Sequence, residues 1–160
     1  MSVIPSEIVP RIQDLLDAAP VEVRDVANRL GLAVYQMPLA SGVSGVLLRE
    51  PSYKTPSGFA ILVNGAEPYV RQRFTAAHEI GHYVLHRDQI GNRVEDNYLL
   101  RAEGMSDAIE VEANKFAADM LMPWPLLNAH IQAGHSSVSS LAAIFQVSEI
   151  AMAIRIGHVT

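Results

Sequence analysis

The chain has 160 residues, of which 49% are hydrophobic and 18% are charged, so its composition is that of a globular rather than a disordered protein. Its formal net charge of −5 argues against nonspecific binding to nucleic acid, which requires a basic surface. The sequence contains no cysteine, which excludes disulfide bonds and thiolate metal sites. Because neither a signal peptide nor an apolar run of about 18 residues occurs, we expect a soluble, cytoplasmic protein with no membrane partner.

The first half of the chain predicts two helices followed by three strands. An N-terminal helix within residues 1–20 begins near Ser6 and Pro10 and ends at Pro20, and a shorter helix covers residues 21–30. Apolar runs bounded by turn-forming residues predict the strands. The three strand segments are 32–37, 45–49 and 59–63.

The second half predicts helices. A long helix over 67–87 is followed by an irregular polar segment over 88–106 and by a strong helix over 107–122, which Pro123 and Pro125 stop. Two short helices close the chain within residues 136–160. The order of helices, small sheet and further helices predicts the α+β class, with a three-stranded, mostly antiparallel sheet in a single domain over residues 1–160.

His78, Glu79 and His82 form an H-E-x-x-H pattern in the long predicted helix. At about 100° per residue, the two histidines lie about 40° apart on one helix face, one turn from each other. Two imidazole nitrogens can then bind one Zn²⁺ ion at about 2.0–2.1 Å. Glu79 lies to the side, where its carboxylate can act as a general base on a metal-activated water.

A zinc peptidase needs a third protein ligand and one open position. The metzincin pattern, which supplies a third histidine shortly after the motif, is excluded because Leu85 and Asp88 occupy the corresponding positions. His86 lies one further turn along the helix, and three histidines on one straight helix cannot surround a single ion. We therefore interpret His86 as a residue that either supports the ligands or lies at the surface.

Glu110 is the better third ligand. It begins the alanine-rich, core-facing stripe of the helix over 107–122, whereas Glu112 faces solvent. A carboxylate on such a stripe is costly unless it is paired, and small residues let this helix approach the histidine helix. An ordinary carboxylate at a helix N-terminus is the alternative interpretation of Glu110. Asn114, one turn further, can hydrogen-bond a ligand histidine.

With these residues in place, the chain resembles the ImmA/IrrE metallopeptidase family. The segments 73–86 and 110–123 carry the resemblance, residues 141–155 are similar to the closing helices of the family, and the likeness extends over roughly residues 20–160. The resemblance implies a zincin-like core, zinc ligands at His78, His82 and Glu110, and a catalytic role for Glu79. It also implies a zinc-dependent endopeptidase that cleaves a helix-turn-helix repressor, or an antitoxin-type protein in a toxin–antitoxin-like pair.

Two other functions remain open at this stage. Residues 141–151 have helix-turn-helix character, but Arg155 is the single lysine or arginine after Leu126, so direct binding of nucleic acid is not expected. A regulatory binding module that keeps the zinc site but cleaves little is the other alternative.

The sequence leaves two details of the mechanism undecided. The strand over 59–63 is a candidate to hold an extended substrate by β-augmentation. The group that stabilises the oxyanion is one of several side chains. They are Tyr53, Tyr69, Arg71, Tyr98 and His135.

Overall fold

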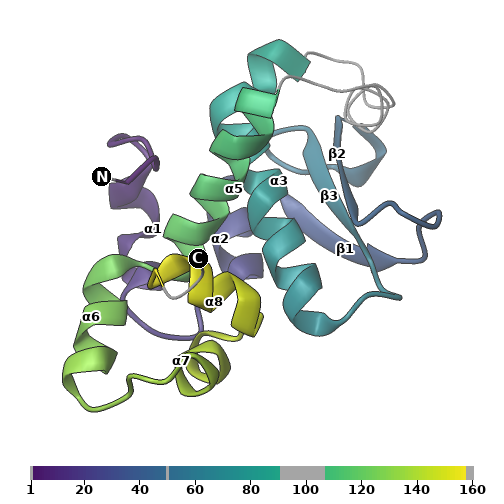
Figure 1. Cartoon of the computed structure of the whole chain (residues 1–160). Coiled ribbons are helices and arrows are strands. Elements are labelled where there is room, and N and C mark those ends of the chain that lie inside the picture. The colour runs from purple at the N-terminus through teal and green to yellow at the C-terminus, as the bar shows by residue number, and fades with distance from the viewer. Residues whose placement is uncertain (1, 50, 91–106, 158–160) are drawn as a thin grey trace.

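The computed structural model describes residues 2–49, 51–90 and 107–157, which form seven helices and one three-stranded sheet (Figure 1). The predicted α+β class is confirmed. The predicted loop over 91–106 lies outside the described residues, whereas residues 88–90 continue the preceding helix. In chain order the elements are α1 (Val9–Leu16), α2 (Val23–Arg29), β1 (Ala33–Met37), β2 (Gly45–Arg49), the 3-10 turn η1 (Pro51–Tyr53), β3 (Phe59–Asn64), α3 (Tyr69–Ile90), α5 (Asp107–Leu121), α6 (Trp124–Gln132), α7 (Val138–Phe145) and α8 (Glu149–Arg155).

The sheet is mixed, with strand order β1-β3-β2. β3 pairs in parallel with β1, where Ile61 is opposite Val34, and antiparallel with β2, where Ile61 is opposite Leu47. The prediction of a mostly antiparallel sheet is corrected, because the pairing of β3 with β1 is parallel. β3 lies between the two earlier strands, and β1, separated from β3 along the chain by β2, runs in the same direction as β3. All six residues of β3 are buried, as a central strand requires.

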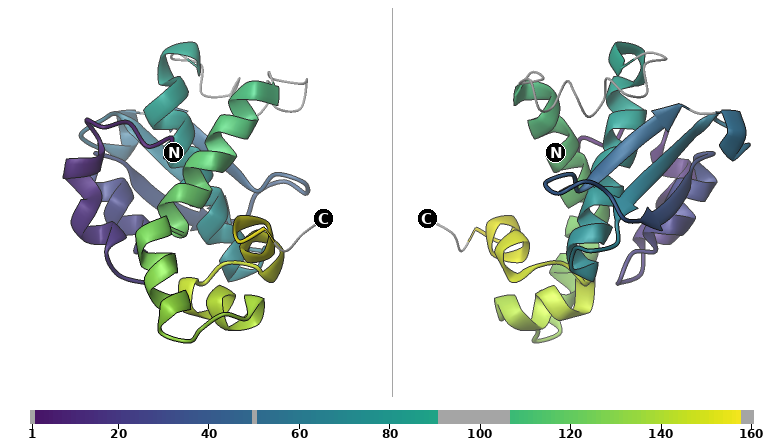
Figure 2. Two further views of the ribbon diagram at one scale, coloured as in Figure 1. Left: turned by 60° about the vertical axis from the view of Figure 1, so that its left-hand side comes forward. Right: turned by 90° about the vertical axis from the view of Figure 1, so that its right-hand side faces the viewer.

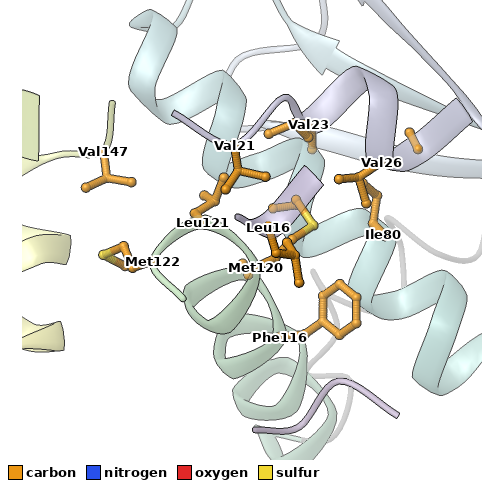
Figure 3. Packing of buried hydrophobic residues seen from close by; sticks show 14 of the residues in the cluster. Leu16, Val21, Val23, Val26, Ile80, Phe116, Met120, Leu121, Met122 and Val147 are labelled. Carbon is orange, nitrogen blue, oxygen red and sulfur yellow. The ribbon is translucent and has the colours of Figure 1, made fainter. Parts of the chain in front are cut away.

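One continuous core joins the N-terminal helices to α3 and α5. α1 contributes Ile12 and Leu16, which are four residues apart and therefore lie on one helix face. Figure 3 shows Leu16 in this core together with Val26 of α2, Ile80 of α3 and Phe116 of α5. The apolar face of each helix thus meets the others, and α3 also packs on β2 and β3.

α3 and α5 run side by side in opposite directions, and their contact sets the position of the site described below (Figure 1). Gly81 permits this close contact, because a Cβ atom there would lie 3.0 Å from the Cβ and 3.1 Å from the ring of Phe116. Phe116 is fully buried, so it has little room to move away.

Replacing Gly81 with valine is therefore expected to destabilise the fold by about 1–3 kcal/mol, because the added side chain overpacks the α3–α5 contact. Thermal or denaturant unfolding measures the change. Ala129→Val, at an exposed position within α6, is the matched control for introducing a β-branched residue into a helix. Equal unfolding free energies for the two variants would contradict the close contact.

The C-terminal helices α6, α7 and α8 gather at the end of α5 that lies near the start of α3 (Figure 2). The sequence predicts the two short closing helices but not α6, because Pro123 and Pro125 indicate only the end of the preceding helix. Pro123 is the N-cap of α6 and Pro125 lies in its first turn, where the missing N–H of proline costs nothing. The buried Arg73 of α3 donates to the carbonyl oxygens of Phe145 and Gln146 and so ties α7 to the core.

Among the described helices, none is by itself long and apolar enough to cross a membrane, although α7 and α8 would pass that test as a pair bent by 108°.

Candidate metal centre

A cleft of about 1130 Å³ opens between the sheet and the helices. Residues 42–45, which lead into β2, form one wall, together with the side of α3 that carries His78. α5 forms the opposite wall, from Glu110 to Asp119. The cleft is also lined by Trp124 of α6 and Ile154 of α8, in the C-terminal part of the chain. A groove of this size, open on one side, has room for a polypeptide segment.

Two histidines and one carboxylate converge in this cleft. Nε2 of His78 lies 3.1 Å from one oxygen of Glu110, and Nε2 of His82 lies 3.1 Å from the other. The three potential ligand atoms all lie within 4.8 Å of one another. The imidazole rings are nearly perpendicular, at 86°, with centroids 4.6 Å apart. The structure therefore brings together the residues from α3 and α5 that the sequence singled out.

The donor set and its spacing suit a small divalent cation. Two ligand atoms about 2.0–2.1 Å from a tetrahedral ion lie about 3.3 Å apart, close to the two nitrogen–oxygen separations of 3.1 Å. Two imidazoles and one carboxylate are a donor set that catalytic zinc sites use. His78, His82 and Glu110 could thus hold such an ion and leave one position open toward the cleft.

Burial and the neighbouring histidines shift the pKa of Glu110 in opposite directions. Burial raises the pKa of its carboxyl group, but the contacts with the imidazoles of His78 and His82 outweigh burial and hold that pKa well below its usual range. Glu110 is therefore ionised at neutral pH, as a metal ligand must be. The side chain of Glu110 is 29% exposed and that of His82 is fully buried, so the His–His–Glu group lies at the boundary between core and cleft.

Each histidine uses its other ring nitrogen in a second contact. Nδ1 of His78 is 2.8 Å from Oδ1 of Asn114, an oxygen that can only accept. His78 must therefore carry its proton on Nδ1, which leaves Nε2 unprotonated toward the cleft. Nδ1 of His82 is 3.0 Å from Nδ1 of His86, whose Nε2 is 3.4 Å from Glu112. His86 is 2% exposed, so the alternative that it lies at the surface is wrong.

Glu79 lies beside this group, fully buried in α3 next to β2. Gly45 makes the contact between strand and helix possible, because a Cβ atom there would lie 3.7 Å from Cγ of Glu79 and would clash with Cγ2 of Thr75. The backbone of β2 therefore passes directly over the part of α3 that carries Glu79. Sequence reasoning missed this role of Gly45, because glycine in a strand indicates close approach without naming the partner.

Two expectations about substrate contacts change. The strand over 59–63 cannot accept an added strand, because β3 is central and both of its edges are already paired. Among the described strands β2 lies at one end of the sheet order, and its first residue, Gly45, lines the cleft. Among the candidates for stabilising the oxyanion that the structure describes, Arg71 is the one that lines the cleft; Tyr98 lies outside the described residues.

The fold and the His–His–Glu group are those of a zincin-like metallopeptidase domain. Residues 27–157 match the peptidase family described as the IrrE N-terminal-like domain, and the chain belongs to this family. The resemblance to the ImmA/IrrE family is thereby confirmed.

Two curated relatives are the radiation response metalloproteases IrrE of Deinococcus radiodurans and Deinococcus deserti. The first is 32% identical over 148 residues, covering 86% of this chain and 44% of the relative. The second is 32% identical over 124 residues, covering 71% of this chain and 43% of the relative. The chain thus spans less than half the length of the curated relatives it matches.

A solved structure of a Mycobacterium tuberculosis transcriptional regulator has a similar fold, with a TM-score of 0.63 and 17% sequence identity. The match covers 94% of this chain and 45% of that chain. At this identity the likeness concerns the fold alone.

Proposed function

We propose that the chain is a zinc-dependent endopeptidase that cleaves a helix-turn-helix repressor or an antitoxin-type protein partner. The observation that carries the proposal is the convergence of His78, His82 and Glu110 in an open cleft. Glu79 follows the first of these histidines on the same helix. Membership of a peptidase family and two metalloprotease relatives support the same activity.

In the proposed reaction His78, His82 and Glu110 hold the zinc ion, which when bound would activate a water molecule and polarise the scissile carbonyl group. Glu79 takes the proton from the attacking water and later delivers it to the leaving amine. Its burial beside β2 shields the carboxylate from bulk solvent. Asn114 holds the ring of His78 in the tautomer that presents Nε2.

The contact between Asn114 and His78 leads to a prediction about metal affinity. Asn114→Ala removes the acceptor for the Nδ1 proton of His78 and should weaken zinc binding by about 10–100-fold. Asn114→Asp keeps an acceptor oxygen and should bind zinc close to the wild-type level. Competition with a chromophoric chelator measures both affinities, and an alanine variant that binds as tightly as the aspartate variant would contradict the role of this contact.

The segment that leads into β2 suits an extended substrate. Residues 42–45, of which Gly45 is the first residue of β2, line the cleft, so an extended peptide bound there would lie along this segment. Arg71 lies in the same region, where it donates to Ser44 and pairs with Glu67 at 3.8 Å. Seven residues, or about 10 Å along the helix axis, separate Arg71 from His78. Arg71 is therefore placed to contact a substrate away from the scissile bond.

The substrate class rests on the family resemblance, and the surface charge favours a protein over DNA as the partner. In the helix-turn-helix-like pair α7 and α8, Arg155 pairs with Asp119 at 3.0 Å, donates to the carbonyl of Met122, and stacks on Trp124 at 4.7 Å. That guanidinium is committed to contacts within the chain rather than to phosphates. A repressor substrate also places the proposed reaction in the cytoplasm.

Mapping of protein N-termini tests this proposal. Cells that carry the gene should show a new N-terminus within a helix-turn-helix protein or an antitoxin-type protein, and cells that lack the gene should not. The same cut should then appear when the two purified proteins are mixed with zinc. Absence of any gene-dependent N-terminus would instead favour a binding module with little proteolytic activity.

A further inference from the structure

We propose that His86 is a positioning residue of the metal centre, which accepts a hydrogen bond from Nδ1 of His82 and thereby keeps Nε2 of His82 unprotonated. The inference rests on the proposed zinc function but concerns a residue outside the ligand set. His86 lies one turn beyond His82 on α3, and the two rings are 5.1 Å apart between centroids, tilted by 54°.

The protons along this chain of contacts can be assigned in one order. Glu112 is a carboxylate that can only accept, so Nε2 of His86, 3.4 Å from its oxygen, carries a proton. A neutral His86 then has an unprotonated Nδ1. That nitrogen is 3.0 Å from Nδ1 of His82, which must therefore be the donor. The neutral His82 ring is left with a lone pair on Nε2, the atom that faces Glu110 at 3.1 Å.

His86 is not a ligand in this arrangement, because its Nδ1 faces Nδ1 of His82 rather than the ligand atoms of the group, and its Nε2 faces Glu112. His86 is nevertheless needed as the hydrogen-bond acceptor for His82. His82 is fully buried, so water cannot replace the acceptor for its Nδ1 proton. A buried donor without a partner costs about 1–3 kcal/mol. Without His86, the ring of His82 would gain by turning, which moves Nε2 away from the metal, or by changing tautomer, which places a proton on Nε2.

The two ligand histidines thus have different acceptors. His78, at the cleft, donates to the amide oxygen of the exposed Asn114, whereas His82, in the core, donates to a ring nitrogen. Glu112 in turn orients His86, but it is 56% exposed, so water can take over much of its part. The burial of each contact predicts how strongly its loss lowers the zinc affinity. Loss of His86 should therefore lower the zinc affinity much more than loss of Glu112.

Two substitutions of His86 distinguish the effect of its hydrogen-bond acceptor from the effect of its size. Asparagine attaches its amide oxygen to Cγ, as histidine does Nδ1, so His86→Asn keeps the acceptor that faces His82. Leucine fills similar space but offers no acceptor. We expect His86→Leu to bind zinc about 10–100-fold more weakly than wild type. His86→Asn should recover most of that loss, and Glu112→Gln should differ little from wild type. Chelator competition on the full chain gives these affinities without any substrate.

Long-range ¹H–¹⁵N NMR correlation of the histidine side chains provides the second measurement. The zinc-loaded wild type should show His86 with its proton on Nε2 and His82 with its proton on Nδ1. Equal zinc affinities for the leucine and asparagine variants, or a proton on Nδ1 of His86, would overturn the inference while the zinc-peptidase proposal stands. A wild-type chain that takes up no zinc would overturn both, and loss of peptidase activity alone would leave this inference intact.

Discussion

Replacing Glu79 with glutamine should abolish substrate cleavage while leaving zinc binding unchanged. Glutamine has nearly the same size as glutamate and fits the same buried position beside β2, but its amide cannot take a proton from water. General acid–base catalysis contributes about 10²–10⁴-fold, so the cleavage rate should fall by at least that factor. Since Glu79 is outside the His–His–Glu group, the metal should stay in place.

The measurement needs two readouts on the same preparation. Zinc content per chain should equal that of wild type, and the rate of cleavage of the partner found by N-terminal mapping should be near zero. A Glu79→Gln protein that cleaves at the wild-type rate would remove Glu79 from the mechanism. A protein that loses both zinc and cleavage would show instead that Glu79 acts through the metal site or the fold.

The second large effect is expected at Glu110, where alanine should remove the metal. The carboxylate contacts both histidine Nε2 atoms at 3.1 Å, and without it two imidazoles from one helix are left to hold the ion. Loss of a direct ligand should weaken zinc binding by more than the about 10–100-fold that outer contacts contribute. Cleavage should disappear with the metal.

Glu112→Gln is the matched control for this change, because it removes a carboxylate from the same helix two residues away. Glu112 is 56% exposed and contacts His86 rather than the ligand atoms. The control should therefore retain zinc and activity. If Glu110→Ala held zinc as tightly as Glu112→Gln, the third ligand would have to come from elsewhere.

Local patterns indicated His78, His82 and Glu110, which the structure brings together. The helical spacing of His78 and His82 follows from the geometry of one helix, and the structure places both side chains as that spacing implies. The alanine-rich face of α5 predicted its close approach to α3, and Ala113 and Ala117 are both fully buried. Glu110 lies in the first turn of that face and lines the cleft.

Features that depend on contacts between distant segments were harder to predict. The strand segments could be read from apolar runs, but nothing in them specifies that β3 lies between β1 and β2. The strand that the sequence suggests for substrate pairing is consequently the central one, whose two sides are already paired. Similarly, α6 begins at Pro123 and Pro125. The missing N–H of proline stops a preceding helix and is tolerated in the first turn of the next one, so the sequence does not distinguish the two cases.

The role of His86 also depends on three-dimensional contacts. Its position on the helix excluded it as a third ligand on the same face, but burial and the contact with Glu112 come from the packing of α5 against α3. Sequence spacing therefore identified the ligand candidates, whereas the arrangement that fixes their protons became apparent only in the fold.

Anomalous X-ray diffraction from crystals of the zinc-loaded wild-type chain tests the central proposal most directly. The proposal predicts one zinc peak per chain, within about 2.0–2.2 Å of Nε2 of His78, Nε2 of His82 and a carboxylate oxygen of Glu110. A peak coordinated by other side chains, or no peak in protein supplied with zinc, would contradict it.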